Sequence, residues 1–196
     1  MMMWPARAAI RPVPAHAVVP ERVVHDVEES FTDAQDLEAR VDRAFGELDA
    51  QQPVMARYLA RMVDHVPDET AQALGHFLGV AVHHAFATAF GARLRPVDDR
   101  VLETAVASME WDEELRRGAA DEVLESDDVV AIGQPHVVAF VREQLEAALE
   151  ADEDGDPPDV DLEAIASVYR AVLVEILALS QAVQPPHGVR RTEILA

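Results

Sequence analysis

The sequence predicts an all-α fold, and three observations support this prediction. Apolar residues recur at intervals of three and four along several segments, as they do on one face of a helix. Hydrophobic residues make up 49% of the 196 residues and aromatic residues only 5%, so the core must be built mainly from aliphatic side chains. No segment alternates apolar and polar residues between turn signals, as a half-buried strand would. We therefore predict a single-domain helical bundle of about six helices.

Prolines and charged residues set the predicted boundaries. Residues 1–30 contain four prolines and no helical periodicity, which indicates a flexible N-terminal tail. The all-α domain is predicted over residues 31–184, and residues 185–196 form a loose C-terminal tail. The first residues lack the unbroken apolar run of a signal peptide, and no interior segment is predicted to span a bilayer, so we expect a cytoplasmic protein.

The individual helices follow from caps and breakers. The first starts near Thr32, which has the capping-box spacing with Gln35. Pro53 opens the second, and the third ends at Gly91, a plausible C-cap. A fourth region, from about residue 98, is either two helices or one broken helix, and residues 126–133 are a predicted linker. A fifth helix and a long last helix complete the bundle, and the third and last helices are predicted to form its buried centre.

Two segments resemble each other. QPVMARYL, which begins at Gln52, and QPHVVAFV, which begins at Gln134, both place Gln-Pro before an apolar helix. Each is preceded by a helix and followed by a longer, more apolar one. This pattern is compatible with a weak duplication of a three-helix unit, although Gln-Pro is also a common way to start a helix.

The composition excludes several functions. The formal net charge is -21, from 37 acidic residues against 16 basic ones, all of them arginine. No segment supplies the basic patch that nucleic acid or an anionic membrane would require, so neither is an expected partner. The chain has no cysteine, which rules out disulfides, cysteine-ligated zinc, iron–sulfur clusters and thiol nucleophiles.

Three of the eight histidines lie in one predicted helix, GHFLGVAVHHAFATAFG. His76 and His83 share a face but are separated by ~10.5 Å along the axis, and His83 and His84 diverge by ~100°, so this helix alone can give at most one ligand to a metal. Glu175 is the one acid within the apolar run of the last helix. These four residues are the candidate ligand or metal-binding groups; the alternative is that they are hydrogen-bonded or ion-paired structural residues.

The acidic segment EADEDGDPPDVD, residues 150–161, partly matches the oxygen spacing of an EF-hand loop. It begins with Glu instead of Asp, ends with Asp instead of Glu, and carries two prolines where the loop needs an apolar residue with a free amide. We predict a solvated acidic linker, with a weak divalent-cation site as the alternative.

No phosphate-binding loop, dinucleotide-binding glycine pattern or nucleophile elbow is present. We therefore expect a soluble, acidic, non-enzymatic protein without a cofactor that binds a protein partner, as an adaptor, regulator or chaperone-like protein, and that could form a homo-oligomer. The alternative is a metal- or cofactor-binding helical bundle that uses histidines of the third helix. A partner-binding face should be visible as an exposed apolar patch.

Overall fold

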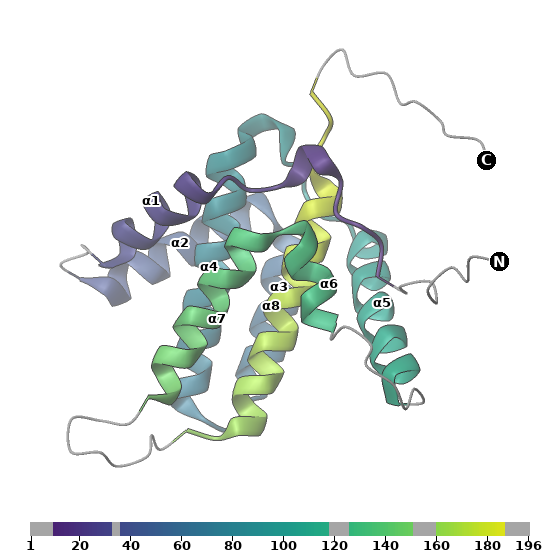
Figure 1. The fold of residues 1–196 in the computed structure, drawn as a ribbon. Coiled ribbons are helices and arrows are strands. Elements are labelled where there is room, and N and C mark those ends of the chain that lie inside the picture. Colours follow the sequence, from purple (N-terminus) through teal and green to yellow (C-terminus); the bar gives the residue numbers. More distant parts are fainter. Residues whose placement is uncertain (1–9, 33–35, 118–125, 151–159, 187–196) are drawn as a thin grey trace.

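A computed structural model of the protein describes residues 10–32, 36–117, 126–150 and 160–186. These residues form helices and no β-strand, which confirms the all-α prediction, but they form eight α-helices instead of about six (Figure 1). Two short 3-10 turns, at Ala15–Ala17 and Gly91–Arg93, accompany them. The helices are α1 (Glu21–Thr32), α2 (Leu37–Gln51), α3 (Pro53–Asp64), α4 (Glu69–Phe90), α5 (Asp99–Arg117), α6 (Ser126–Gly133), α7 (Pro135–Leu149) and α8 (Leu162–Ala182).

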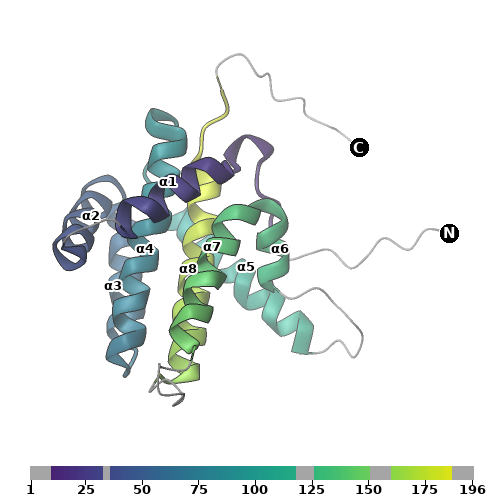
Figure 2. The ribbon, with the colours of Figure 1, turned by 60° about the vertical axis from the view of Figure 1, so that its left-hand side comes forward.

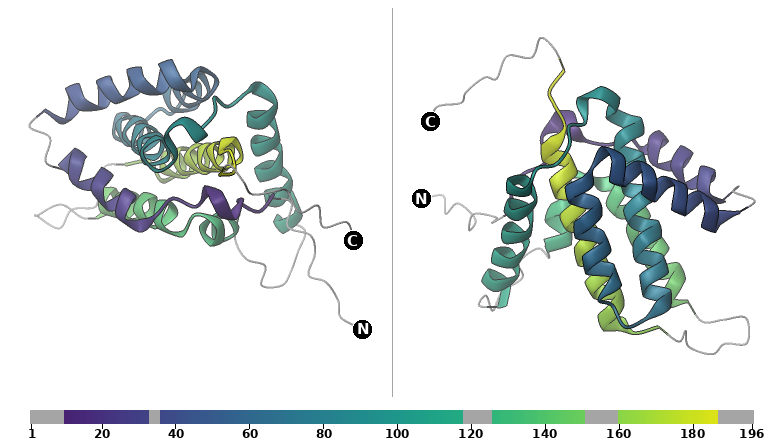
Figure 3. Two further views of the ribbon diagram at one scale, coloured as in Figure 1. Left: turned by 90° about the horizontal axis from the view of Figure 1, so that it is seen from above. Right: turned by 180° about the vertical axis from the view of Figure 1, so that it is seen from behind.

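Helices α4 and α8 form the centre of the bundle, as predicted for the third and last helices. They lie side by side, with α2 and α3 on one side and α1 and α7 on the other (Figure 3). In α8 every residue from Ala171 to Ser180 is buried. The stretch Glu69–Arg93, which contains α4, is long and apolar enough to cross a membrane, yet 56% of its most apolar window is buried inside the protein. Its apolar surface is thus the surface of a core helix.

The segment preceding α2 differs from the predicted flexible tail. Helix α1 lies across α4 and α7 and buries Val24, Val27 and Phe31 against the core (Figure 2). The proline nearest to it, Pro20, directly precedes the helix, where no backbone N–H is required, so it does not prevent helix formation. Residues 1–9 of the predicted tail lie outside the described residues.

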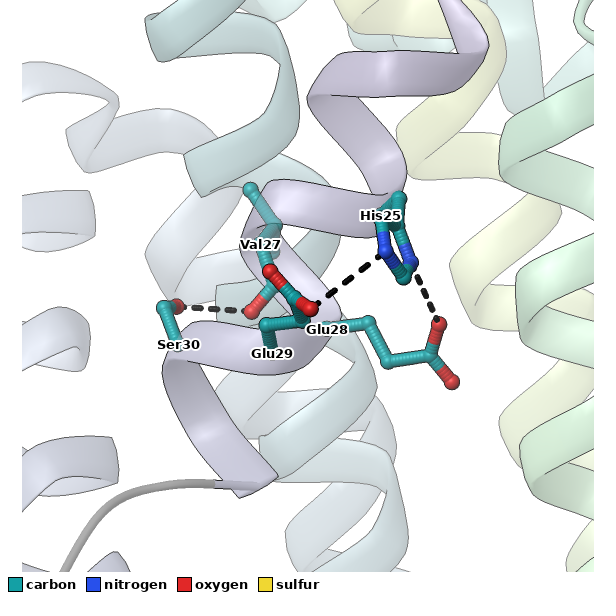
Figure 4. A network of polar contacts seen from close by, with 5 residues as sticks. All are labelled: His25, Val27, Glu28, Glu29 and Ser30. Carbon is teal, nitrogen blue, oxygen red and sulfur yellow. Dashed lines mark hydrogen bonds and ion pairs between the residues drawn. The ribbon is translucent and has the colours of Figure 1, made fainter.

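The outer face of α1 is polar. His25 lies 4.0 Å from a carboxylate oxygen of Glu28 and 3.4 Å from one of Glu29, while the Ser30 hydroxyl donates to the Val27 carbonyl (Figure 4). These are contacts along one helix, and the histidine side chain is 64% exposed, so they contribute little to stability. The amphipathic pattern of α1 explains why it packs as a helix on the core.

Two further expectations differ from the structure. Thr32 ends α1, and the next helix begins after Asp36, whose side chain accepts a hydrogen bond from the Ala39 amide; Gln35 lies outside the described residues. The fourth region is one continuous helix, α5, as far as Arg117, and residues 118–125 are not described.

The predicted linker, residues 126–133, is helix α6. Its Val130 side chain is fully buried, and the Val130 carbonyl accepts the amide of Gln134. Burial of one apolar face therefore makes this short segment helical, although eight residues alone are too few for a stable helix in water. Of the predicted C-terminal tail, Pro185 and Pro186 are exposed, and residues 187–196 are not described.

The close approach of α4 to its neighbours gives the first prediction. A Cβ atom added at Gly75 would lie 2.9 Å from a methyl of Val63 and 3.2 Å from one of Val168. Valine side chains are stiff, so Gly75→Ala should lower the free energy of unfolding by about 1–3 kcal/mol. Gly46→Ala is the matched control: it lies within α2 with no atom within 4 Å, and it should raise that free energy by about 0.5–1 kcal/mol. Urea titrations of both variants measure the difference, and equal stability would contradict the close packing.

Candidate functional site

His76 and His84 contact different parts of the protein. The His76 ring nitrogen Nε2 lies 3.5 Å from an Asp64 carboxylate oxygen, and its ring meets Phe45 edge-on. His84 meets Phe31 of α1 edge-on, with ring centroids 6.3 Å apart. Burial lowers the pKa of His84, and nearby Arg40 lowers it further. The two side chains therefore lie in separate surroundings at two positions along α4.

His83 faces the interior. Its side chain is 2% exposed, and its Nε2 atom has no hydrogen-bond partner among the described residues. Burial lowers its pKa to about 4, and the neighbouring His84 contributes in the same direction. At neutral pH the imidazole is thus uncharged, as expected for a ring enclosed by apolar side chains.

Glu175 is the most unusual residue of the core. It is fully buried in α8, and neither carboxyl oxygen has a hydrogen-bond partner among the described residues. A Cβ atom at Gly79 would lie 3.7 Å from one of these oxygens, so α4 faces the carboxyl with a glycine. Burial raises the pKa of Glu175 well above 4.5, which favours the protonated acid.

Tyr58 of α3 is close enough to Glu175 to be affected by its charge. Burial raises the pKa of Tyr58 to about 12; Arg170 lowers it, and Glu175 raises it. Its hydroxyl also has no partner within the described part of the chain. No sequence signal distinguishes Tyr58, because a tyrosine in an apolar helical stripe has the same pattern as an ordinary core residue. Helices α3 and α8 therefore each place one unpartnered polar group in the apolar core.

The four predicted ligand residues do not form a metal-binding group. Within the described ranges, no set of three or more histidine, aspartate or glutamate side chains could hold a metal ion. Residues 151–159 of the acidic segment lie outside the described residues; its last residue, Asp161, caps α8 by accepting the Glu163 amide. Any ligand role for these residues stays a prediction.

The described surface contains an apolar groove between α2 and α4, with a volume of about 570 Å³. One wall comes from α2 and the other from α4, and acidic residues of α2 flank it. Of the apolar lining, Leu37 is 48% exposed, whereas the two phenylalanines are partly buried. The residues of this α2–α4 groove are Leu37, Glu38, Val41, Asp42, Phe45, Ala73, His76 and Phe77.

A second hollow, of about 300 Å³, lies between α5, α8 and the segment before α1. Many of its polar groups are already used within the protein. Asp98 accepts the Val101 amide, the Ser108 hydroxyl donates to the Thr104 carbonyl, and Gln181 donates to Pro12. Since these groups are engaged, the hollow is a weaker candidate for a binding site than the α2–α4 groove.

The buried acid should make stability depend on pH. The folded-state pKa of Glu175 is raised above its unfolded value of 4.5, so the folded protein retains a proton that the unfolded chain releases. Stability should fall as pH rises from the unfolded pKa towards the folded one, by up to about 1.4 kcal/mol per pH unit. Glu175→Gln removes this loss. Urea titrations from about pH 5 to about pH 9 should show a growing advantage for the variant; a constant difference would contradict the raised pKa.

The buried histidine should act in the opposite direction. The pKa of His83 falls from 6.5 to about 4 on folding, so below pH 6.5 the unfolded chain binds a proton that the folded protein does not. Stability should be lost as pH falls through this window, by roughly 3 kcal/mol in total. His83→Phe should abolish that loss in acid titrations. The control His25→Gln changes an exposed histidine and should leave the acid-induced loss of stability unchanged. Equal effects of both variants would count against a buried, neutral His83.

Comparison with known proteins gives no relative: no family model, no curated protein sequence and no solved structure matches this chain.

Proposed function

We propose that the protein binds another polypeptide without catalysing a reaction, and that the α2–α4 groove receives an amphipathic helix of that partner. The observation that carries this proposal is the open apolar lining of the groove. Apolar patches that remain uncovered on a folded domain commonly mark interaction sites.

The way in which α2 packs supports a helical occupant. Only Leu48, near its C-terminal end, is fully buried, whereas Leu37 at the other end is largely exposed. Leu37, Val41 and Phe45 are spaced by four residues and line one wall, opposite Phe77 of α4. A groove between two helices accommodates a third helix whose apolar residues recur at intervals of three and four.

The charge around the groove favours a basic partner. Glu38 and Asp42 border the groove and are exposed, and the whole chain has a net charge of -21. A helix with arginine or lysine beside its apolar face would be attracted to this surface, whereas an acidic one would be repelled. The occupant we propose is therefore an amphipathic helix that is apolar on one side and basic along its flanks.

A photo-cross-linking experiment tests the groove. Ala73 is exposed and lines it, so a photoreactive amino acid at this position should cross-link one defined polypeptide in cells that express the full chain. Leu37→Ser should reduce the yield of the cross-linked product at least about tenfold, because losing the contact of a buried leucine with the partner costs over about 1.4 kcal/mol of binding free energy.

Leu162→Ser is the matched control. Leu162 is a leucine that is 68% exposed on α8, outside the groove, so its replacement should leave the cross-linked product unchanged. The proposal fails if the two serine variants behave alike, or if a photoreactive residue at exposed Ala50 captures the same product. A covalent dimer of the chain would show that a second copy occupies the groove and would overturn the assignment to a basic partner helix.

A further inference from the structure

Two glutamines occupy matching positions in the two halves of the chain. Gln52 precedes Pro53 and α3, and Gln134 precedes Pro135 and α7, with nearly identical backbone angles (φ -135° and ψ 58°; φ -135° and ψ 61°). Both side chains are buried. In each case the backbone amide of the glutamine donates to the carbonyl of the residue four positions earlier. Its backbone carbonyl accepts the amide of the residue four positions later.

Each glutamine side chain holds a segment of the other half. The Gln52 carboxamide accepts the Val97 amide at 2.7 Å and donates to the Arg95 carbonyl at 3.1 Å. The Gln134 carboxamide accepts the Val19 amide at 3.0 Å and donates to the Ala17 carbonyl. Both held segments end two residues before a helix, α5 in one case and α1 in the other. The two contacts are therefore reciprocal.

The core positions of the helices also match. The buried residues of α3 all have buried counterparts in α7, 82 positions further along the chain, as Gln134 is from Gln52. In α1, three buried residues, the first of them Val24, likewise have buried counterparts in α5, 78 positions further along the chain. The pairs are Met55 and Val137, Ala56 and Val138, Tyr58 and Phe140, Leu59 and Val141, Val63 and Leu145, then Val24 and Leu102, Val27 and Ala105, Phe31 and Met109.

The two central helices are joined at both ends. At their N-termini the Asp161 amide donates to the side chain of Asp68, and these two residues are the N-caps of α8 and α4. At their C-termini Leu94 and Val183 form an isolated antiparallel bridge, in which each segment donates one backbone amide to the other. The helices α4 and α8 therefore run parallel, as helices related by a twofold axis along their length would.

We infer that the chain consists of two copies of one four-helix unit, α1–α4 and α5–α8, fused in tandem and related by this twofold axis. The surface between the copies corresponds to the interface of a symmetric dimer, whose partner is a second copy of the unit. The segments that precede α1 and α5 are exchanged, so that each copy holds the other's segment. The unit has four helices, one more than the Gln-Pro pattern alone suggests.

Amide hydrogen exchange in the full-length protein tests the reciprocal contacts. Gln52→Leu should accelerate exchange at Val97 about tenfold or more, because a buried amide loses its acceptor, and should leave Val19 protected. Gln134→Leu should have the converse effect. Gln72→Leu is the control, since the Gln72 side chain donates to the Val66 carbonyl in its own half, and it should affect neither amide. Protection that is unchanged, or lost equally at both amides, would contradict the inference.

A segment exchange tests the equivalence of the copies. Residues 97–109 placed at positions 19–31 preserve every matched core position, so this full-length chimaera should unfold cooperatively with nearly native helicity. Residues 98–110 at the same positions shift the apolar face by one residue, about 100° around the helix, and should prevent cooperative folding. Circular dichroism melting curves compare the two. Equal behaviour of the chimaeras, whether both fold or both fail, would overturn the equivalence.

Discussion

The close, parallel packing of α4 against α8 is the constraint on which the rest of the structure depends. Both helices are apolar almost all round, so neither can remain at the surface, and the small residues Gly75 and Gly79 let neighbouring side chains approach α4 closely. Parallel helices also bring two positive N-terminal ends together. The carboxylates of Asp68 and Asp161 lie at those ends, where negative charge is favourable, and the Ala71 and Asp161 amides bonded to Asp68 lower its pKa. The other helices then cover the sides of this pair.

Much of this arrangement was visible in the sequence, and the exceptions have physical reasons. The C-terminal end of α4 followed from Gly91, because caps are local signals that depend on a few neighbouring residues. The four prolines among residues 1–30 conceal helix α1 in the sequence, although all of them lie before its first residue. Helix α6 was missed because eight residues carry little periodicity, and its stability comes from tertiary burial of Val130. The pairing of helices could not be predicted, since periodicity identifies an apolar face but not the face that covers it.

The candidate sites were predicted to different extents. Residue type and position correctly marked His83 and Glu175 as polar groups within apolar helices, whereas they did not show whether those groups meet a partner. Tyr58 carried no signal, because its phenol ring belongs in a core and only the tertiary structure shows that its hydroxyl is unpartnered among the described residues. An exposed apolar patch was expected in general terms. Its location between α2 and α4 depends on how far the N-terminal end of α2 remains uncovered, which is a property of the packing.

The similarity of the two halves makes each an internal reference for the other. At the position that corresponds to Tyr58 the second half has Phe140. Counted from the N-caps Asp68 and Asp161, the position in α4 that corresponds to Glu175 holds Val82, and all four side chains are buried. The same architecture is therefore built with apolar residues at these positions, so helix packing does not require the carboxyl or the phenol. Burying a carboxyl without a partner opposes folding, because water solvates it better than aliphatic side chains do. Glu175 and Tyr58 thus reduce stability relative to the valine and phenylalanine that the fold accepts at the corresponding positions.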